Sequence, residues 1–188
     1  MDALDALTRS EAEVLARVEQ LDAEHWNMPT VCGGWTVDDL VRHVVGGSTM
    51  AVTGLTGAPK ERVVEASQCT ADGDLVEALR SALAAQAAAV RAPGALDVTV
   101  HHPTIDMSGE QLLGFRIVDL AMHAWDLARS LGFDESLDAD LVAWTWEWLQ
   151  PIAPFIGTIG VFGDGPSGTL SDDDPLDQRL IDLTGRRP

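Results

Sequence analysis

Apolar residues recur along most of the chain at a spacing of three to four residues, which is typical of amphipathic helices. The periodicity predicts five helices, over residues 4–21, 36–52, 75–91, 109–131 and 137–149. Thr36 begins the second of these, and Asp39 three residues later makes an approximate capping box. Gly132 closes the fourth helix, as glycine commonly does at a helix C-terminus.

Few other segments carry a secondary-structure pattern. Val98 and Val100 alternate in LDVTVHHPT, which predicts a short extended segment without an evident partner strand. Residues 57–72 break the helical pattern, and residues 155–188 are expected to be largely irregular. We therefore predict an all-α fold, a four-helix bundle with additional short helices, as a single domain over residues 1–188.

The predicted helix over 109–131 is apolar on nearly every side, so we expect it to be the most buried one. Polar side chains on such a helix need partners, because burial without them costs stability. Asp119, His123 and Asp126 fall within about 60° of one another on one helix face. Residues four apart stand about 5–6 Å apart at Cβ, a span that one metal ion can bridge between Asp119 and His123.

A third ligand is expected from a facing helix, and His43 is the candidate, midway along the predicted helix over 36–52. Gly46 and Gly47 follow one turn later, where missing side chains leave room for a neighbouring helix or a ligand. Glycine costs a helix interior about 1 kcal/mol relative to alanine, so the pair needs a reason. Two histidines and one carboxylate are a common catalytic zinc set with an open position, and the set also serves iron, nickel or manganese.

Other interpretations stand beside the metal hypothesis. The spacing of Asp119 and His123 arises often by chance, and a buried hydrogen bond between them would explain it without metal. His101 and His102 are a rival ligand pair, but neighbours on an extended segment point to opposite sides. A loop is the favoured interpretation for those two histidines.

Charge and composition restrict the partners. The net charge is −18, from 12 Lys and Arg against 30 Asp and Glu, which disfavours nucleic acid and anionic membranes. No apolar run approaches a membrane span, and the acidic N-terminus is typical of neither a secretory signal nor a transit peptide. We expect a cytoplasmic protein in which Cys32 and Cys69 are reduced thiols. The predominance of Arg over Lys, with abundant Ala, Gly, Asp and Val, resembles the usage of high-GC bacteria.

The predicted helix over 137–149 contains Trp144, Trp146 and Trp148, which are 200° apart in succession and therefore spread round the helix. That is more Trp than one core face can absorb. We interpret these side chains as packing or dimer contacts and expect a homodimer.

Three segments resemble the mycothiol-dependent maleylpyruvate isomerase family, whose members belong to the DinB-like superfamily of metal-binding helical bundles. The first segment is PTVCGGWTVDDLVRHVVGG, which is similar to the family signature W-x-x-P-T-x-C-x-x-W-[ST]-V-x-D-L-x-x-H. The second is GFRIVDLAMHAWDLARSLG, which matches a carboxylate, three residues, His and a W-D-L-A-R run. The third, the tail VFGDG…PLDQRLIDLTGRRP, resembles the ending of one actinobacterial branch.

The resemblance implies that His43 and His123 occupy the two metal-binding histidine positions. Asp119 then stands where characterised isomerases have Glu, one methylene longer, so ligand distance or metal preference is expected to differ. Zinc is the expected metal, with nickel, iron or manganese as alternatives. Asp126 and Arg116 are predicted to orient a ligand or to contact substrate.

The resemblance also implies a thiol chemistry, in which a metal-bound thiol cofactor, mycothiol in the family, attacks a small-molecule substrate as thiolate. The isomerases use a separate C-terminal domain that we expect this chain not to contain, so maleylpyruvate isomerisation itself is not expected. The leading hypothesis is a metal- and thiol-dependent S-transferase or isomerase. A metal-binding or sensor protein without turnover is the second, and a metal-dependent hydrolase with Asp126 or Asp39 as base is the third.

Overall fold

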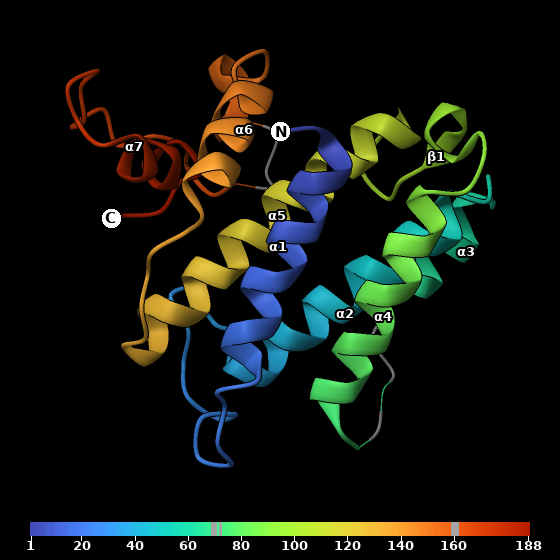
Figure 1. Ribbon diagram of the computed structural model, residues 1–188, viewed down its shortest axis with the longest axis horizontal. Coiled ribbons are helices and arrows are strands. Elements are labelled where there is room, and N and C mark those ends of the chain that lie inside the picture. The colour runs from blue at the N-terminus through green and yellow to red at the C-terminus, as the bar shows by residue number, and fades with distance from the viewer. Residues whose placement is uncertain (69–70, 72, 159–161) are drawn as a thin grey trace. The chain divides into compact units, whose positions relative to one another are not determined.

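Helices are the dominant elements of the computed structural model, which describes residues 1–68, 71, 73–158 and 162–188 (Figure 1). The α-helices are α1 (Ala3–Val18), α2 (Val37–Gly54), α3 (Lys60–Ala66), α4 (Leu75–Val90), α5 (Gly109–Leu131), α6 (Ala139–Leu149) and α7 (Leu176–Leu183). Two 3-10 turns, η1 (Ala95–Asp97) and η2 (Ala153–Thr158), and two strands, β1 (Thr99–His101) and β2 (Asp106–Ser108), complete the description. The predicted all-α class is confirmed.

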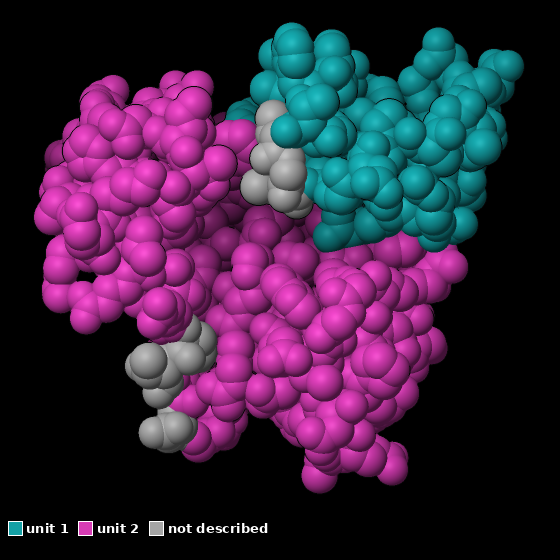
Figure 2. Space-filling view, turned by 180° about the vertical axis from the view of Figure 1, so that it is seen from behind, with its two compact units in different colours: residues 1, 136–188 teal, residues 2–135 magenta. Residues whose placement is uncertain are grey.

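The chain divides into two compact units, coloured separately in Figure 2. The larger unit comprises residues 2–135, and the smaller unit comprises Met1 and residues 136–188. The expectation of one domain over residues 1–188 stays a prediction.

The five predicted helices are present as α1, α2, α4, α5 and α6, because local signals set their ends. Thr36 and Asp39 form the predicted capping box of α2, each side chain accepting from the other residue's backbone N–H. Ser108 and Gln111 cap α5 in the same way. Gly132 ends α5 at φ 69°, a left-handed conformation that favours glycine.

The additional short helices were predicted without their positions, and a second strand was not predicted. Helix α3 lies within the segment 57–72, and its single buried residue is Val63, too little apolar surface to show as periodicity. Strand β1 does have a partner, because β2 pairs with it antiparallel and matches Val100 to Met107. The sequence of β2, Asp-Met-Ser, carries no strand signal. Helix α7 lies in the tail that was expected to be largely irregular.

Four helices form the core of the larger unit. Helix α1 packs against α5, and α2 packs against both α4 and α5. Helix α5 is buried on most of its surface, as its apolar composition predicts, and it holds Leu113, Ile117 and Leu120 at 2% exposure or less. Each such side chain contributes roughly 1.5–3 kcal/mol relative to an exposed one. The packing of α2 on α5 brings His43 and the polar face of α5 together.

The smaller unit is built on α6 and α7, which pack on each other. Trp144 and Trp148 lie one turn apart on α6 and stack with ring centroids 6.4 Å apart. The guanidinium of Arg179 in α7 covers Trp146, 4.7 Å from the ring centroid, a cation–π distance. Among the described residues, no helix combines the length and the apolar character needed to cross a membrane.

Candidate metal centre

Two imidazoles from different helices converge on one carboxylate oxygen in the larger unit. Asp119 Oδ1 on α5 lies 3.3 Å from Nε2 of His43 on α2 and 3.4 Å from Nε2 of His123, one turn along α5. The three ligand atoms all lie within 4.8 Å of one another, and the two imidazole centroids are 4.9 Å apart. The structure therefore brings together the residues that the sequence analysis nominated as ligands.

The spacing of these atoms fits a bound cation. Ligands about 2.0–2.1 Å from a tetrahedral Zn²⁺ are themselves separated by about 3.3 Å. Direct charge-assisted hydrogen bonds would be shorter, about 2.7–2.9 Å. Hydrogen bonds of that kind do occur around the site, at 2.6 Å from Arg116 Nη1 to Asp119 Oδ2 and 2.8 Å between His123 Nδ1 and Asp126 Oδ2. Each proposed nitrogen ligand thus lies from Asp119 Oδ1 at about the separation of two ligands on one Zn²⁺. The bonds from Asp119 and His123 to their outer partners are shorter.

Asp119 uses its two oxygens differently. Oδ2 accepts from Arg116, whose side chain is only 5% exposed, and Oδ1 faces the two imidazoles. Burial opposes ionisation, but the positive charges of His123 and Arg116, with hydrogen bonds from both histidines, hold the pKa of Asp119 well below its usual value. Asp119 is therefore a carboxylate, the form that binds a cation.

The outer side of His123 is also fixed. Asp126, 1% exposed, accepts from His123 Nδ1, which leaves Nε2 to face Asp119. Burial opposes the charged imidazole, but the charge of Asp119 and hydrogen bonds with Asp119, Asp126 and Cys32 outweigh it and raise the pKa of His123 well above its usual value. A carboxylate behind a ligating histidine fixes the ring orientation and increases its basicity.

The proximity of Cys32 to this group of side chains was not predicted from the sequence. Its Sγ donates to Asp126 Oδ2 at 3.2 Å and lies 4.0 Å from His123 Nδ1. Cys32, His123 and Asp126 therefore form a second group of potential ligands. His123 Nδ1 and Asp126 Oδ2 are hydrogen-bonded to each other. We therefore interpret Cys32 and Asp126 as residues that orient His123 rather than as metal ligands. Cys69 lies outside the described residues.

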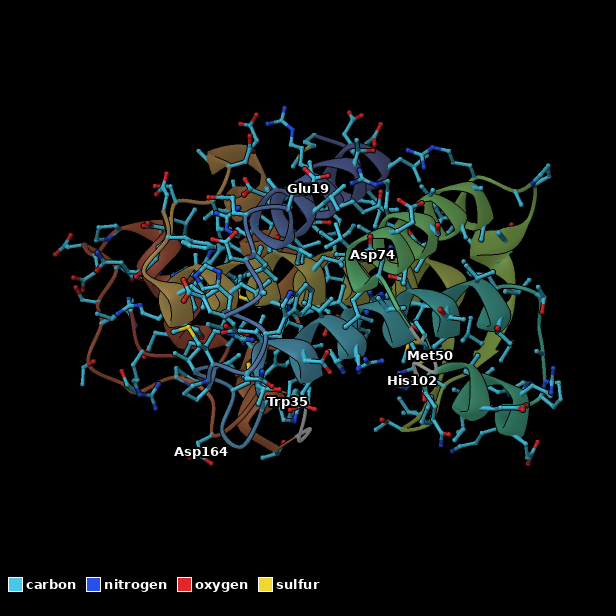
Figure 3. The ribbon with its side chains drawn as sticks, turned by 90° about the horizontal axis from the view of Figure 1, so that it is seen from below. Glu19, Trp35, Met50, Asp74, His102 and Asp164 are labelled. Atoms are coloured by element: carbon cyan, nitrogen blue, oxygen red, sulfur yellow. The ribbon has the colours of Figure 1, made fainter. Side chains whose placement is uncertain are left out.

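Cys32 and Trp35 lie in the loop between α1 and α2, and Trp35 is labelled in Figure 3. The turn of this loop is closed by hydrogen bonds from Thr30 N to Trp35 O and from Trp35 N to Cys32 O, and Gly34 supplies the positive φ of 85°. Ser130 Oγ on α5 accepts from the Val31 backbone and ties the turn to the helix that carries Asp119. Loop residues could not be assigned to the site from helical periodicity.

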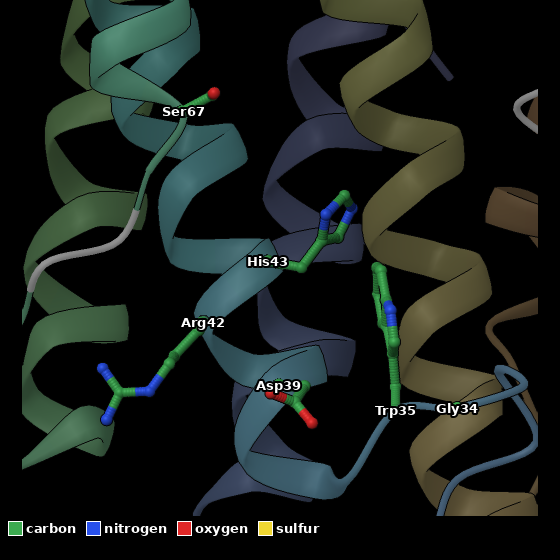
Figure 4. Close-up of a pocket in the computed structure, with 6 residues that line it drawn as sticks. All are labelled: Gly34, Trp35, Asp39, Arg42, His43 and Ser67. Carbon is green, nitrogen blue, oxygen red and sulfur yellow. The ribbon is translucent and has the colours of Figure 1, made fainter.

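A pocket of about 330 Å³ opens beside His43. Its lining residues are Gly34, Trp35, Asp39, Arg42, His43 and Ser67 (Figure 4). Figure 4 shows the ring of Trp35 next to that of His43, with centroids 4.9 Å apart, while Arg42 extends in the other direction. The side chain of His43 is 40% exposed and that of Asp119 27%, so the ligand cluster can be reached from solvent.

Two other residues that the sequence singled out, Arg116 and His101, are not among the three proposed ligands. Arg116 bonds to Asp119, Gln86 and Ser48 inside the bundle, which favours an orienting role over substrate contact. His101 pairs with Asp106 across the hairpin at 3.1 Å and belongs to neither potential ligand group.

A helical bundle in which imidazoles and a carboxylate from two helices converge has the architecture of a metal-binding bundle protein. The chain belongs to the family described as the mycothiol maleylpyruvate isomerase N-terminal domain, which matches residues 7–128, all within the larger unit. The family is DinB-like and is linked to metal binding and to mycothiol. The resemblance found in the sequence is thereby confirmed.

Two relatives extend the match beyond the family domain. Each is described as an uncharacterized protein of Mycobacterium tuberculosis, one from strain CDC 1551 and one from strain H37Rv. Both are 31% identical to this chain over 175 residues, which cover 93% of this chain and 89% of the relative. No solved structure matches the chain significantly.

Proposed function

We propose that the protein binds one divalent cation between His43, Asp119 and His123 and uses it to activate a low-molecular-weight thiol. The observation that carries the proposal is the convergence of both Nε2 atoms on Asp119 Oδ1 at 3.3 and 3.4 Å. Two nitrogens and one carboxylate oxygen suit zinc best, and nickel, iron and manganese remain alternatives. Family membership supports mycothiol as the thiol.

The chemistry of such a site would be the transfer or isomerisation of a small substrate through its sulfur adduct. A divalent cation lowers the pKa of a thiol that binds to it, so that thiolate is the attacking form at neutral pH. Because Asp126 accepts from His123 Nδ1, Nε2 is the nitrogen left to face a cation. The pocket beside His43 has the volume to admit a small molecule.

A metal-binding protein without turnover is the second candidate, because two charged side chains of the pocket are already engaged. Asp39 accepts from the Thr36 backbone and hydroxyl, and Arg42 donates to Asp38. Metal-dependent hydrolysis has weaker support, since Asp126 is 1% exposed and accepts two hydrogen bonds, which leaves it unsuited to act as a base.

Cobalt substitution tests the proposed function. We expect one divalent ion per chain by elemental analysis, retained in His101→Ala and lost in the His43→Ala, His123→Ala double variant. The absorption bands of the Co²⁺ protein should change when mycothiol is added, because sulfur would enter the coordination sphere. Stoichiometric metal in the double variant would overturn the ligand set, and Co²⁺ bands unaffected by any thiol would favour the binding protein over the thiol enzyme.

A further inference from the structure

A chain of polar side chains crosses the helical bundle and ends on Asp119. Glu11 on α1 accepts from Gln86 Nε2 on α4 at 3.0 Å. Gln86 Oε1 accepts from Arg116 Nε on α5 at 2.9 Å, and Arg116 Nη1 donates to Asp119 Oδ2 at 2.6 Å. Gln86 is fully buried and Arg116 is 4% exposed, so both side chains are held inside the bundle.

The guanidinium at the centre of this chain is held from a third direction as well. Arg116 Nη2 donates to Ser48 Oγ at 3.1 Å and lies 3.4 Å from the Val44 carbonyl oxygen, both on α2. A buried charge is costly unless its donors are satisfied, so these partners together select one orientation of the planar group. Gly47 leaves the space that Arg116 fills, since a Cβ there would lie 2.2 Å from Nη1.

The orientation of the guanidinium decides which oxygen of Asp119 can meet a cation. With Oδ2 committed to Arg116, Oδ1 alone faces His43 and His123. We propose that Gln86 and Glu11 are positioning residues of the metal centre, which act through Arg116 to hold Asp119 as a ligand through one oxygen. The inference rests on the proposed metal site, and it assigns a role in that site to two residues that touch none of its ligands.

Gln86, and not Arg116, is the residue to change. Removing the charge of Arg116 would also remove a cation that repels a bound dication, and the two effects would oppose each other. Gln86→Met deletes both hydrogen bonds of the amide, keeps a similar volume and neither adds nor removes an ionisable side chain. Leu83→Ala is the matched control, because Leu83 is buried on α4 one turn before Gln86 and lies outside the polar chain.

The measurements are the affinity for Zn²⁺ and Co²⁺ by competition with a chelator, the Co²⁺ absorption spectrum, and the melting temperature of the metal-free protein. We expect Gln86→Met to weaken metal binding about tenfold, the lower end for residues behind a ligand, and to shift the Co²⁺ bands. Leu83→Ala should lower the melting temperature while keeping the wild-type affinity and bands. A structural role alone would not separate the two variants in this way.

Exchanging the side chains of Glu11 and Gln86 conserves the total charge and should restore metal affinity. This exchange tests the proposal even if Gln86→Met fails to fold. Gln86→Glu alone sets two carboxylates against each other and should weaken metal binding. The Glu11→Gln, Gln86→Glu double variant exchanges donor and acceptor, so both hydrogen bonds and the total charge are retained, and affinity should return.

The outcomes separate this inference from the proposed function. Wild-type affinity and bands in Gln86→Met, an equal loss in Leu83→Ala, or failure of the double variant to recover would overturn the positioning role and leave the metal site standing. Failure of the wild-type protein to bind metal at all would overturn both.

Discussion

The two carboxylate oxygens of Asp119 have different partners, and only one of them faces the imidazoles. Oδ2 accepts the short hydrogen bond from Arg116, and Oδ1 stands between two imidazole nitrogens. His123 is similarly divided, with Nδ1 on Asp126 and Nε2 towards Asp119. Each proposed ligand on α5 therefore has one atom that faces the proposed cation and one that bonds to the protein.

Asp119→Asn should lower the affinity for Zn²⁺ by more than about 100-fold, because a neutral amide is a poor partner for a dication. Substitution of a residue that only hydrogen-bonds to a metal ligand lowers affinity by about 10–100-fold. Asp119→Glu should keep the metal, and Asp126→Asn should fall within the smaller range. Chelator competition measures all three. Wild-type affinity in Asp119→Asn would place the carboxylate outside the coordination sphere.

Gly47→Ala should destabilise the protein, although the same change in an ordinary helix interior stabilises it by about 0.5–1 kcal/mol. The added Cβ would lie 2.2 Å from Nη1 and 2.9 Å from Cζ of Arg116, too close for either group to stay in place. Thermal unfolding should show a lower melting temperature, and metal affinity should fall with it. A higher melting temperature would mean that Arg116 does not fill this space.

Metal binding should release roughly one proton per chain near neutral pH, since the raised pKa of His123 keeps its Nε2 protonated in the metal-free protein. The cation must displace that proton, so affinity should fall as the pH falls through the pKa of His123. The lowered pKa of Asp119 means that this carboxylate is already ionised and adds no proton. Calorimetry in buffers of different ionisation enthalpy counts the protons, and pH-independent affinity between pH 6 and 8 would contradict the assignment of His123 as a ligand.

At the scale of elements, the proposed site lies between α2 and α5. Helix α5 carries two of the proposed ligands on successive turns and α2 carries the third, so neither helix alone offers all three. The helices are already packed and capped without metal, since Thr36 and Ser108 complete capping boxes at their starts. The cation should therefore add to the stability of a bundle that is folded in its absence.

Excess Zn²⁺ should raise the free energy of unfolding by about 2.7 kcal/mol at a free concentration 100 times the Kd, because it binds the folded state only. His43→Ala removes the ligand from α2 and should abolish most of this increase. Urea unfolding with and without chelator measures the difference. An undiminished increase in His43→Ala would show that the cation does not join α2 to α5.

At the scale of the whole molecule, the family match and the division of the chain agree on the larger unit, since residues 7–128 fall within residues 2–135. The smaller unit follows that match and includes the Trp-rich helix α6. A net charge of −18 on 188 residues favours solubility and opposes close approach of two copies at low ionic strength.

The predicted homodimer should therefore be strengthened by salt, which screens repulsion between exposed charges. Light scattering at micromolar concentration should give a mass near twice 20.1 kDa, with a larger dimer fraction at higher ionic strength. A monomer at both low and high salt would contradict the dimer that the Trp residues of α6 suggested.

The sequence alone was sufficient to locate the main helices and to nominate His43, Asp119 and His123. Both results depend on local regularities: apolar periodicity reports which face of a helix is buried, and caps mark where it begins and ends. Asp119 and His123 share one α5 face because of their spacing. His43 was nominated because it is a histidine midway along another predicted helix.

The tertiary structure decided which groups stand behind those ligands. Gln86 sits in an Ala-rich helix, Glu11 on an amphipathic one and Cys32 in a loop, and no local pattern relates any of them to Asp119 or His123. Their contacts join residues 75 positions apart for Glu11 and Gln86 and 94 positions apart for Cys32 and Asp126. Such pairs depend on the rotation and crossing of packed helices and on the course of a turn, and a chain's local periodicity carries no information about either.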